Sequence, residues 1–291
     1  MYRKVLLSAV ALCFFSSDFS KAAVSDQHRR GNDAQRKSNV RKTDSSIKKS
    51  KSRKAAKNSH LSKDRDFEVP KLKSFPENKV HLVLMALRLP RINRINALRQ
   101  LGKGYAPILA ALAFEKSESL QVRWRAVTSL GEAFPGQAQK TLAKALSSNE
   151  WYLRNAGLIG MTHVSRSRSL SWAGKLLDDP ALVVRTAAVK TISSLNGQHL
   201  EGQLWRKLYS KENYNKGKSL WIRKHIAKTL SQFAKAGRES YFMRVLSDSD
   251  TSLHPYAINA LETLHGKKAP ENSTLEIQRV SWIKWWQSRM R

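Results

Sequence analysis

The sequence of 291 residues contains a single cysteine, Cys13, which lies in an apolar stretch near the N-terminus. One cysteine cannot form an internal disulfide. If the first residues are removed, a thiolate metal site and a cysteine nucleophile are excluded as well. The stability of the folded part must therefore come from side-chain packing.

Long apolar runs are also scarce. The run VLLSAVALCFF at residues 5–15 would rise only about 16 Å as a helix, against roughly 30 Å of membrane hydrocarbon. Together with the basic start MYRK and the small residues Ser20 and Ala22, it predicts a signal peptide at residues 1–22, cleaved after Ala22. An uncleaved anchor is the alternative, and Leu12 disfavours lipoprotein processing at Cys13. We therefore expect an exported protein, periplasmic or secreted, with no membrane span after cleavage.

Recognisable catalytic motifs are missing. The sequence has no G-x-S-x-G, and its histidines lack metal-ligand spacing. Gly217, Lys218 and Ser219 resemble the end of a phosphate-binding loop, but Glu212 stands where that loop needs its first glycine. We expect no catalytic residue, cofactor or metal ion. Distant residues can still converge in space, so an enzyme such as a lyase or glycosylase stays open as a third hypothesis.

Acidic residues are few, because 22 Asp and Glu stand against 53 Lys and Arg, a formal net charge of +31. Residues 23–66 contain 14 basic and 5 acidic residues and no aromatic residue, too little apolar surface to offset the entropy of ordering. We therefore predict a disordered basic arm and linker at residues 23–77. Residues 81–291 have a net charge of +19, so the remaining chain is basic in its own right.

A nine-residue pattern recurs through the rest of the chain. Its six copies are NRINALRQL (93–101), VRWRAVTSL (122–130), LRNAGLIGM (153–161), VRTAAVKTI (184–192), IRKHIAKTL (222–230) and LHPYAINAL (253–261). The fifth, sixth and ninth positions are small or apolar in every copy, which indicates the buried stripe of a helix. A second apolar segment follows each copy. Two helices per repeat predict an all-α solenoid of about six repeats at residues 78–291, because one helical hairpin cannot cover its own apolar face.

The stretch LLDDPALVVRTAAVKTISSL at residues 176–195 resembles the short HEAT-like repeat also found in phycobilin lyases. It shares the acidic turn, the Val-Arg pair and the alanine-rich helix. The resemblance implies a right-handed solenoid and, for function, a scaffold or binding surface. Asn93 and His254 depart from the pattern, which suggests that the terminal repeats are degenerate caps.

The second position of the pattern is basic in every copy: Arg94, Arg123, Arg154, Arg185, Arg223 and His254. In the family that the repeat resembles, this arginine pairs with acidic turn residues between stacked repeats. Acidic residues stand in such turns here: Glu150, Asp178, Asp179, Asp248 and Asp250. We favour such a structural ladder over a row of anion-binding arginines, because stacking demands regular spacing.

The clearest irregularity in the repeat is a seven-residue insertion around YSKENYNKGKS at residues 209–219. Insertions in solenoids often project from the binding face, so Lys211, Lys216 and Lys218 are candidate partner-binding residues. The alternative is a tolerated flexible loop with exposed lysines and tyrosines. In the next helix we expect Trp221 to pack and only Lys224 and Lys228 to remain available to a partner.

Two further segments are candidate contacts. Arg166 and Arg168 in SRSRSLS (165–171) fit an anion, although a solvated turn between helices is the simpler interpretation. Three tryptophans lie on one face of a predicted C-terminal helix: Trp282, Trp285 and Trp286. That face would rest on a membrane surface or, in our preferred interpretation, cover the open end of the last repeat.

These observations favour an exported, non-enzymatic scaffold that binds an acidic partner such as a protein, a glycan or an anionic lipid headgroup. Nucleic acid is the alternative partner, since DNA glycosylases built on HEAT-like repeats hold a duplex. None of their catalytic motifs is present, and the predicted signal peptide argues against that alternative.

Overall fold

The computed structural model describes residues 67–268 and 273–290, all within the second of two units of the chain (Lys54–Arg291). This part is predominantly helical, which confirms the all-α prediction. The predicted signal peptide and most of the predicted basic arm lie outside the described residues. None of the described helices is long and apolar enough to cross a membrane.

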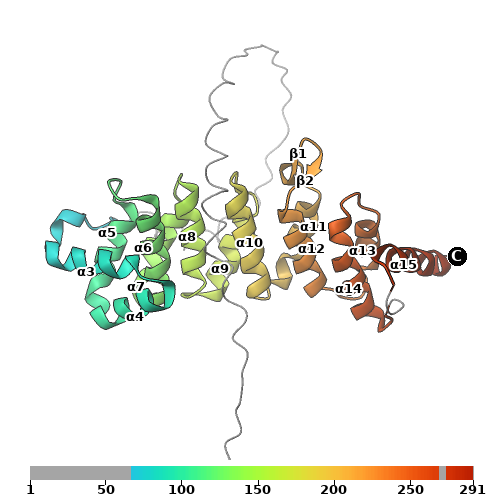
Figure 1. The fold of residues 1–291 in the computed structure, drawn as a ribbon, viewed down its shortest axis with the longest axis horizontal. Helices are drawn as coiled ribbons and strands as arrows, with labels where there is room; N and C mark the ends of the chain where they lie inside the picture. The colour runs from blue at the N-terminus through green and yellow to red at the C-terminus, as the bar shows by residue number, and fades with distance from the viewer. Residues whose placement is uncertain (1–66, 269–272, 291) are drawn as a thin grey trace, which may run out of the picture. The chain divides into compact units, whose positions relative to one another are not determined.

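Thirteen α-helices make up most of the described residues (Figure 1). They are α3 (Glu77–Arg88), α4 (Arg91–Leu101), α5 (Ala106–Phe114), α6 (Leu120–Ala133), α7 (Pro135–Leu146), α8 (Trp151–Met161), α9 (Arg166–Leu176), α10 (Leu182–Ser194), α11 (Glu201–Leu208), α12 (Ile222–Gln232), α13 (Glu239–Leu246), α14 (His254–His265) and α15 (Leu275–Arg289). Shorter elements are the 3₁₀ helices η1 (Leu72–Ser74), η2 (Lys103–Tyr105), η3 (Gln198–Leu200), η4 (Lys211–Asn213) and η5 (Thr251–Leu253), with strands β1 (Tyr214–Asn215) and β2 (Lys218–Ser219).

The nine-residue pattern coincides with every second helix. Its copies lie in α4, α6, α8, α10, α12 and α14, and each of these helices contacts the next one in the series. The second apolar segments form α5, α7, α9, α11 and α13, which pack against the pattern helix that follows. In Figure 1 the elements therefore succeed one another in chain order.

Helix starts are set by local sequence signals. The side chains of Ser119 and Ser165 accept hydrogen bonds from the main-chain N–H groups of Val122 and Arg168, which caps α6 and α9. Proline occupies the first turn of α5, α7 and α14, where its missing N–H costs no helical hydrogen bond.

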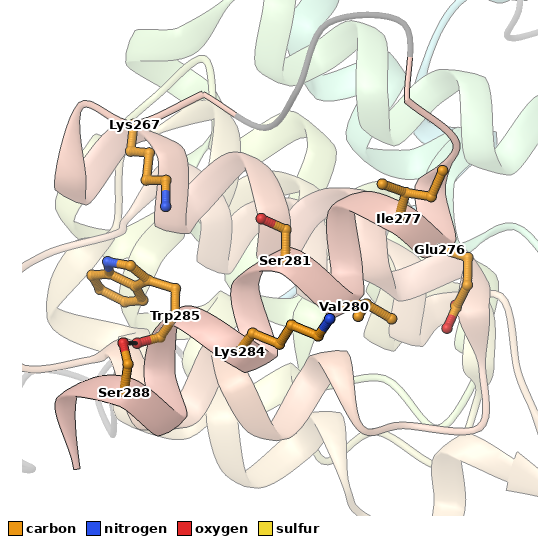
Figure 2. Close-up of a pocket in the computed structure, with 8 residues that line it drawn as sticks. All are labelled: Lys267, Glu276, Ile277, Val280, Ser281, Lys284, Trp285 and Ser288. Carbon is orange, nitrogen blue, oxygen red and sulfur yellow. Dashed lines mark hydrogen bonds between the residues drawn. The ribbon is translucent and has the colours of Figure 1, made fainter. Parts of the chain in front are cut away.

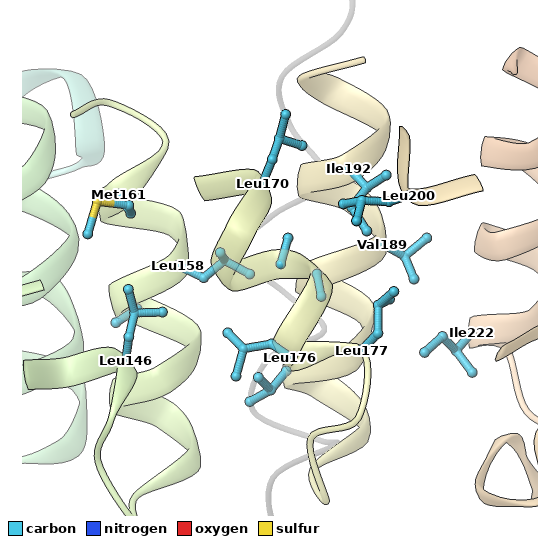
Figure 3. Close-up of a cluster of buried hydrophobic side chains, with 14 of the residues drawn as sticks. Leu146, Leu158, Met161, Leu170, Leu176, Leu177, Val189, Ile192, Leu200 and Ile222 are labelled. Atoms are coloured by element: carbon cyan, nitrogen blue, oxygen red, sulfur yellow. The ribbon is translucent and has the colours of Figure 1, made fainter. Parts of the chain in front are cut away.

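The buried apolar side chains form a cluster that runs from Val83 in α3 to Trp282 in α15. Figure 3 shows part of it, with Leu158 of α8 and Leu176 of α9 between α8 and α10, and with Val189 of α10 on the side that faces Ile222. Each pattern helix thus buries its apolar stripe against its neighbours, as the periodicity predicted.

Two glycines let α6 and α8 approach closely. A Cβ atom added to Gly131 would lie 2.4 Å from the carbonyl oxygen of Gly160, a distance that side chains do not tolerate. A Cβ on Gly160 would lie 2.6 Å from the side chain of Leu142 in α7 and 3.2 Å from the carbonyl oxygen of Val127 in α6. The close approach of α6 and α8 therefore depends above all on glycine at position 131.

The folded structure starts earlier than the predicted boundary at residue 78. Leu72 and Phe75, assigned to the linker by the sequence, pack against the core, and η1 lies between residues 72 and 74. The Lys144 ammonium donates to the main-chain oxygen of Phe67 at 3.0 Å. The apolar residues of this stretch give it the surface to pack that residues 23–66 lack.

The insertion forms a short β-hairpin. Tyr214 pairs with Ser219 and Asn215 pairs with Lys218 in an antiparallel ladder. The two connecting residues, Lys216 and Gly217, have φ angles of 49° and 77°. Two positive φ values in a two-residue connection are typical of a type I′ turn, whose twist matches that of the strands.

Candidate functional site

The ladder arginines (Arg94, Arg123, Arg154, Arg185 and Arg223) are all engaged within the protein. Each donates to at least one main-chain carbonyl that precedes its own helix, as Arg223 does to Leu208 at 2.8 Å. Their guanidinium groups thereby satisfy carbonyls that the turns leave without a helical partner. His254, in the sixth copy, makes the equivalent contact to the carbonyl of Asp248 at 2.9 Å.

Three ladder arginines also pair with acidic turn residues of the next repeat. Arg123 contacts Glu150 at 2.7 Å, Arg154 contacts Asp179 at 2.6 Å, and Arg223 contacts Asp248 at 2.5 Å. Each pair is bidentate, which fixes the orientation of the guanidinium as well as its position.

The other two ladder arginines use neutral acceptors. Arg94 donates to the Ser129 hydroxyl at 3.0 Å, and Arg185 donates to the Asn213 side chain at 3.2 Å and to the carbonyl of Glu212 at 2.8 Å. Asp178, expected in the ladder, instead binds Lys207. Regular spacing therefore located the ladder, but it could not identify the acceptor in each repeat.

The arginines of SRSRSLS are not in a turn, so the predicted turn at residues 165–171 is wrong. α9 begins at Arg166, because Ser165 caps the helix. Arg166 donates to the main-chain oxygen of Leu195 at 2.7 Å. With the Gln139 amide oriented for hydrogen bonding, its oxygen accepts from Arg168 at 2.7 Å. Both guanidinium groups thus donate to other parts of the protein, and Arg166 remains exposed.

A cluster of lysines surrounds His225 on two neighbouring helices. Lys190 comes from α10, and Lys224 and Lys228 come from α12, the helix that α10 contacts. All three lysines are exposed, whereas His225 is half-buried. Lys224 and Lys228 have no hydrogen-bond or ion-pair partner for their ammonium groups among residues 67–268 and 273–290. We call these four residues the lysine cluster.

The positive charge of the lysine cluster affects the pKa of its histidine, His225. Burial lowers the pKa of His225, and repulsion from Lys190, Lys228 and Lys224 lowers it further. The charged groups that shift this pKa are all positive. The cluster therefore presents concentrated positive charge around an imidazole that is neutral at pH 7.

Lys190 was missed in the sequence analysis, although a signal for it exists. It holds the seventh position of its copy of the pattern, as Lys228 does in the next copy. Equivalent positions of adjacent repeats lie on adjacent helices, so the two lysines were predictable neighbours.

Trp221 is 49% exposed, and the prediction that it packs is wrong. The residues aligned with it, Tyr152 and Val183, lie inside the first turn of their helices, whereas Trp221 precedes α12. Its indole meets the His225 ring edge-on at 5.4 Å between centroids. An exposed aromatic ring therefore borders the lysine cluster.

The insertion presents its lysines but not its tyrosines. Lys211, Lys216 and Lys218 are exposed, and no acid pairs with them within the described part of the chain. Tyr209 and Tyr214 are half-buried, contrary to the prediction, and lie against the guanidinium of Arg223 at 5.7 and 4.5 Å. Burial raises the pKa of Tyr209 to about 12, so this phenol stays neutral.

The C-terminal tryptophans pack on the protein. Trp282 is 3% exposed, and Trp285 and Trp286 are half-buried against the core. α15 contacts α13 and α14, and Trp285 lies 4.5 Å from the ring of His265. The geometry agrees with our preferred interpretation, in which this face covers the end of the helix series.

A shallow hollow of about 660 Å³ lies on the outer side of α15 (Figure 2). Its lining includes Lys267, Lys284 and the acid Glu276, which is ion-paired to Arg279 at 2.6 Å. The hydroxyl of Ser288 donates to the main-chain oxygen of Trp285. Within its described lining, no hydrogen bond joins a serine hydroxyl to a lysine or a carboxylate.

Within residues 67–268 and 273–290, no group of three His, Cys, Asp or Glu residues is arranged to hold a metal ion.

Comparison with known proteins does not supply a function. The chain matches no family model, and it has no significant match among curated proteins.

Proposed function

We propose that the protein is an exported, non-enzymatic scaffold of HEAT-like type that binds an acidic glycan. The stacked two-helix arrangement supports a right-handed α-solenoid of about six repeats, as the resemblance implies. The predicted export signal supports a partner in the cell envelope or outside the cell. The basic arm at residues 23–66 would add long-range attraction.

The lysine cluster is the observation that carries this proposal. The ladder arginines are largely buried and engaged in internal contacts, and the arginines of α9 donate hydrogen bonds to Leu195 and Gln139. Lys224 and Lys228 have no such contacts, and they lie beside Lys190 on the neighbouring helix. Because no carboxylate of the described residues pairs with Lys224 or Lys228, their positive charge is available to attract a polyanion.

Trp221 favours a charged sugar chain over a simple anion. An exposed indole can cover the apolar face of a pyranose ring while nearby ammonium groups contact sulfate, phosphate or carboxylate groups. Nucleic acid would use the same lysines and the same ring, and it remains the alternative if residues 1–22 are not removed.

A binding measurement tests this proposal. The protein is titrated with a heparin-derived octasaccharide at several salt concentrations, alongside the double variant Lys224→Gln, Lys228→Gln. We expect the variant to lose about tenfold in affinity at low salt and to show a shallower salt dependence. A matched control, Lys103→Gln with Lys140→Gln, removes the same charge from exposed lysines elsewhere.

Two outcomes would contradict the proposal. Equal losses in the double variant and in its control would mean that net charge alone drives binding. Tighter binding of duplex DNA than of the octasaccharide, with resistance to high salt, would favour the nucleic-acid alternative.

A further inference from the structure

We infer that Lys216, at the tip of the hairpin, is a ligand-contacting residue that extends the binding surface beyond the lysine cluster. This inference rests on the proposed function and deepens it, because it names a residue outside the lysine cluster that would contact the glycan.

The hairpin is held at its base by two ladder arginines. Asn213, 1% exposed, accepts from Arg185 at 3.2 Å, and the hydroxyl of Ser219 accepts from Arg223 at 3.0 Å. The ring of Tyr214 lies 4.5 Å from the Arg223 guanidinium. A hairpin of two-residue strands is not stable alone, so these contacts give it a fixed conformation.

The residue at the tip is a poor choice for the turn. A type I′ turn requires positive φ at both central residues, which favours Asn, Asp or Gly at the first of them. Lys216 occupies that position with φ 49°, and Asn215 stands one residue too early. An L-residue with a Cβ atom adopts this conformation at an energetic cost. Strained positions of this kind concentrate at functional sites.

The charge at the tip is also available. Another lysine of this region, Lys207, is bound by Asp178 and Glu212, and its hydrogen bond lowers the pKa of Glu212 to about 2. Lys216 has no such acid among the described residues. Asp178 and Glu212 therefore neutralise the charge of Lys207, whereas no described carboxylate neutralises the charge of Lys216.

The tip is connected to the lysine cluster by a short, ordered segment. β2 ends at Ser219, α12 begins at Ile222, and Trp221 lies between them. The main-chain N–H of Leu220 donates to Asn213, which ties this segment to the base of the hairpin. The hairpin, the exposed indole and the lysine cluster thus follow one another along the chain, and an extended polyanion is the ligand that could contact all three.

The test is the variant Lys216→Asn in the full-length protein, because asparagine suits the turn and lacks the charge. We expect the midpoint of thermal unfolding to stay equal or to rise by about 1 to 3 °C. We expect affinity for the heparin-derived octasaccharide to fall about threefold, with the slope of log affinity against log salt reduced by about one. Lys103→Gln serves as the control for loss of one positive charge.

The outcomes separate this inference from the function on which it rests. An affinity equal to that of Lys103→Gln, in a variant at least as stable as the wild type, would overturn the role of Lys216 alone. Wild-type protein that binds neither the octasaccharide nor any longer sulfated chain would overturn the proposed function, and this inference with it.

Discussion

Arg223 and Asp248 form a bidentate ion pair between consecutive repeats, with a closest N–O distance of 2.5 Å and an arginine side chain that is 1% exposed. The same guanidinium contacts the hairpin through Ser219 and the end of α11 through Leu208. One buried cation therefore joins two neighbouring repeats and the insertion.

Removal of the acid from this pair is expected to be costly. Asp248→Ala removes the bidentate carboxylate and leaves buried Arg223 only the more distant Asp250, at 3.9 Å, so we expect a loss of about 2 kcal/mol in the free energy of unfolding. Urea unfolding measures it. Arg91→Ala is the control, because its pair with Glu132 is 55% exposed on the arginine side and should contribute less than about 1 kcal/mol. Similar losses in both variants would contradict a special role for the ladder.

The glycine contact between α6 and α8 gives a second prediction. Gly131→Ala places a methyl group against the carbonyl of Gly160, so the helices must separate, and we expect a loss of about 2 kcal/mol. Gly136→Ala in α7 has nothing within 4 Å and should raise stability slightly through helix propensity. Urea midpoints of the two variants should therefore move in opposite directions.

The buried face of α15 predicts a structural role for Trp282. Trp282→Ala should cost about 3 kcal/mol, because it empties space in the core where α15 packs. Ile277→Ala, on an exposed position of the same helix, should cost less than about 1 kcal/mol. If Trp282→Ala left stability unchanged and abolished binding to anionic vesicles, the membrane interpretation of this face would replace ours.

Much of the fold follows from periodicity. Each copy of the nine-residue pattern lies on a helix because its apolar residues recur with a helical period. The resulting apolar stripe is buried by packing against the helix of the next copy. The hairpin was not predictable in this way. Its two-residue strands are too short to show alternation. Lys216 also occupies the first central position of the turn, where Asn, Asp or Gly would have indicated a type I′ hairpin.

The candidate site was only partly visible in the sequence. Lys224 and Lys228 were found because they lie opposite the apolar stripe. Lys190 required comparison of equivalent positions in adjacent repeats. The exposure of Trp221 depends on where α12 begins, which the insertion determines, and no local pattern encodes that boundary.

The titration of His225 tests most directly whether an anion docks at the lysine cluster. In the free protein, burial and three lysines hold its pKa below the ordinary histidine value. A bound polyanion would offset that repulsion and raise the pKa. By linkage, affinity should then increase as pH falls from above the bound pKa to below the free pKa, because protonated His225 adds a positive charge.

NMR titration of isotope-labelled histidines, with the His225 signal assigned through His225→Gln, gives this pKa with and without saturating octasaccharide. Our account predicts a higher pKa for His225 in the complex and a weaker pH dependence of affinity in His225→Gln. An unchanged pKa for His225 while the protein is saturated with ligand would show that the anion binds elsewhere and would contradict the account.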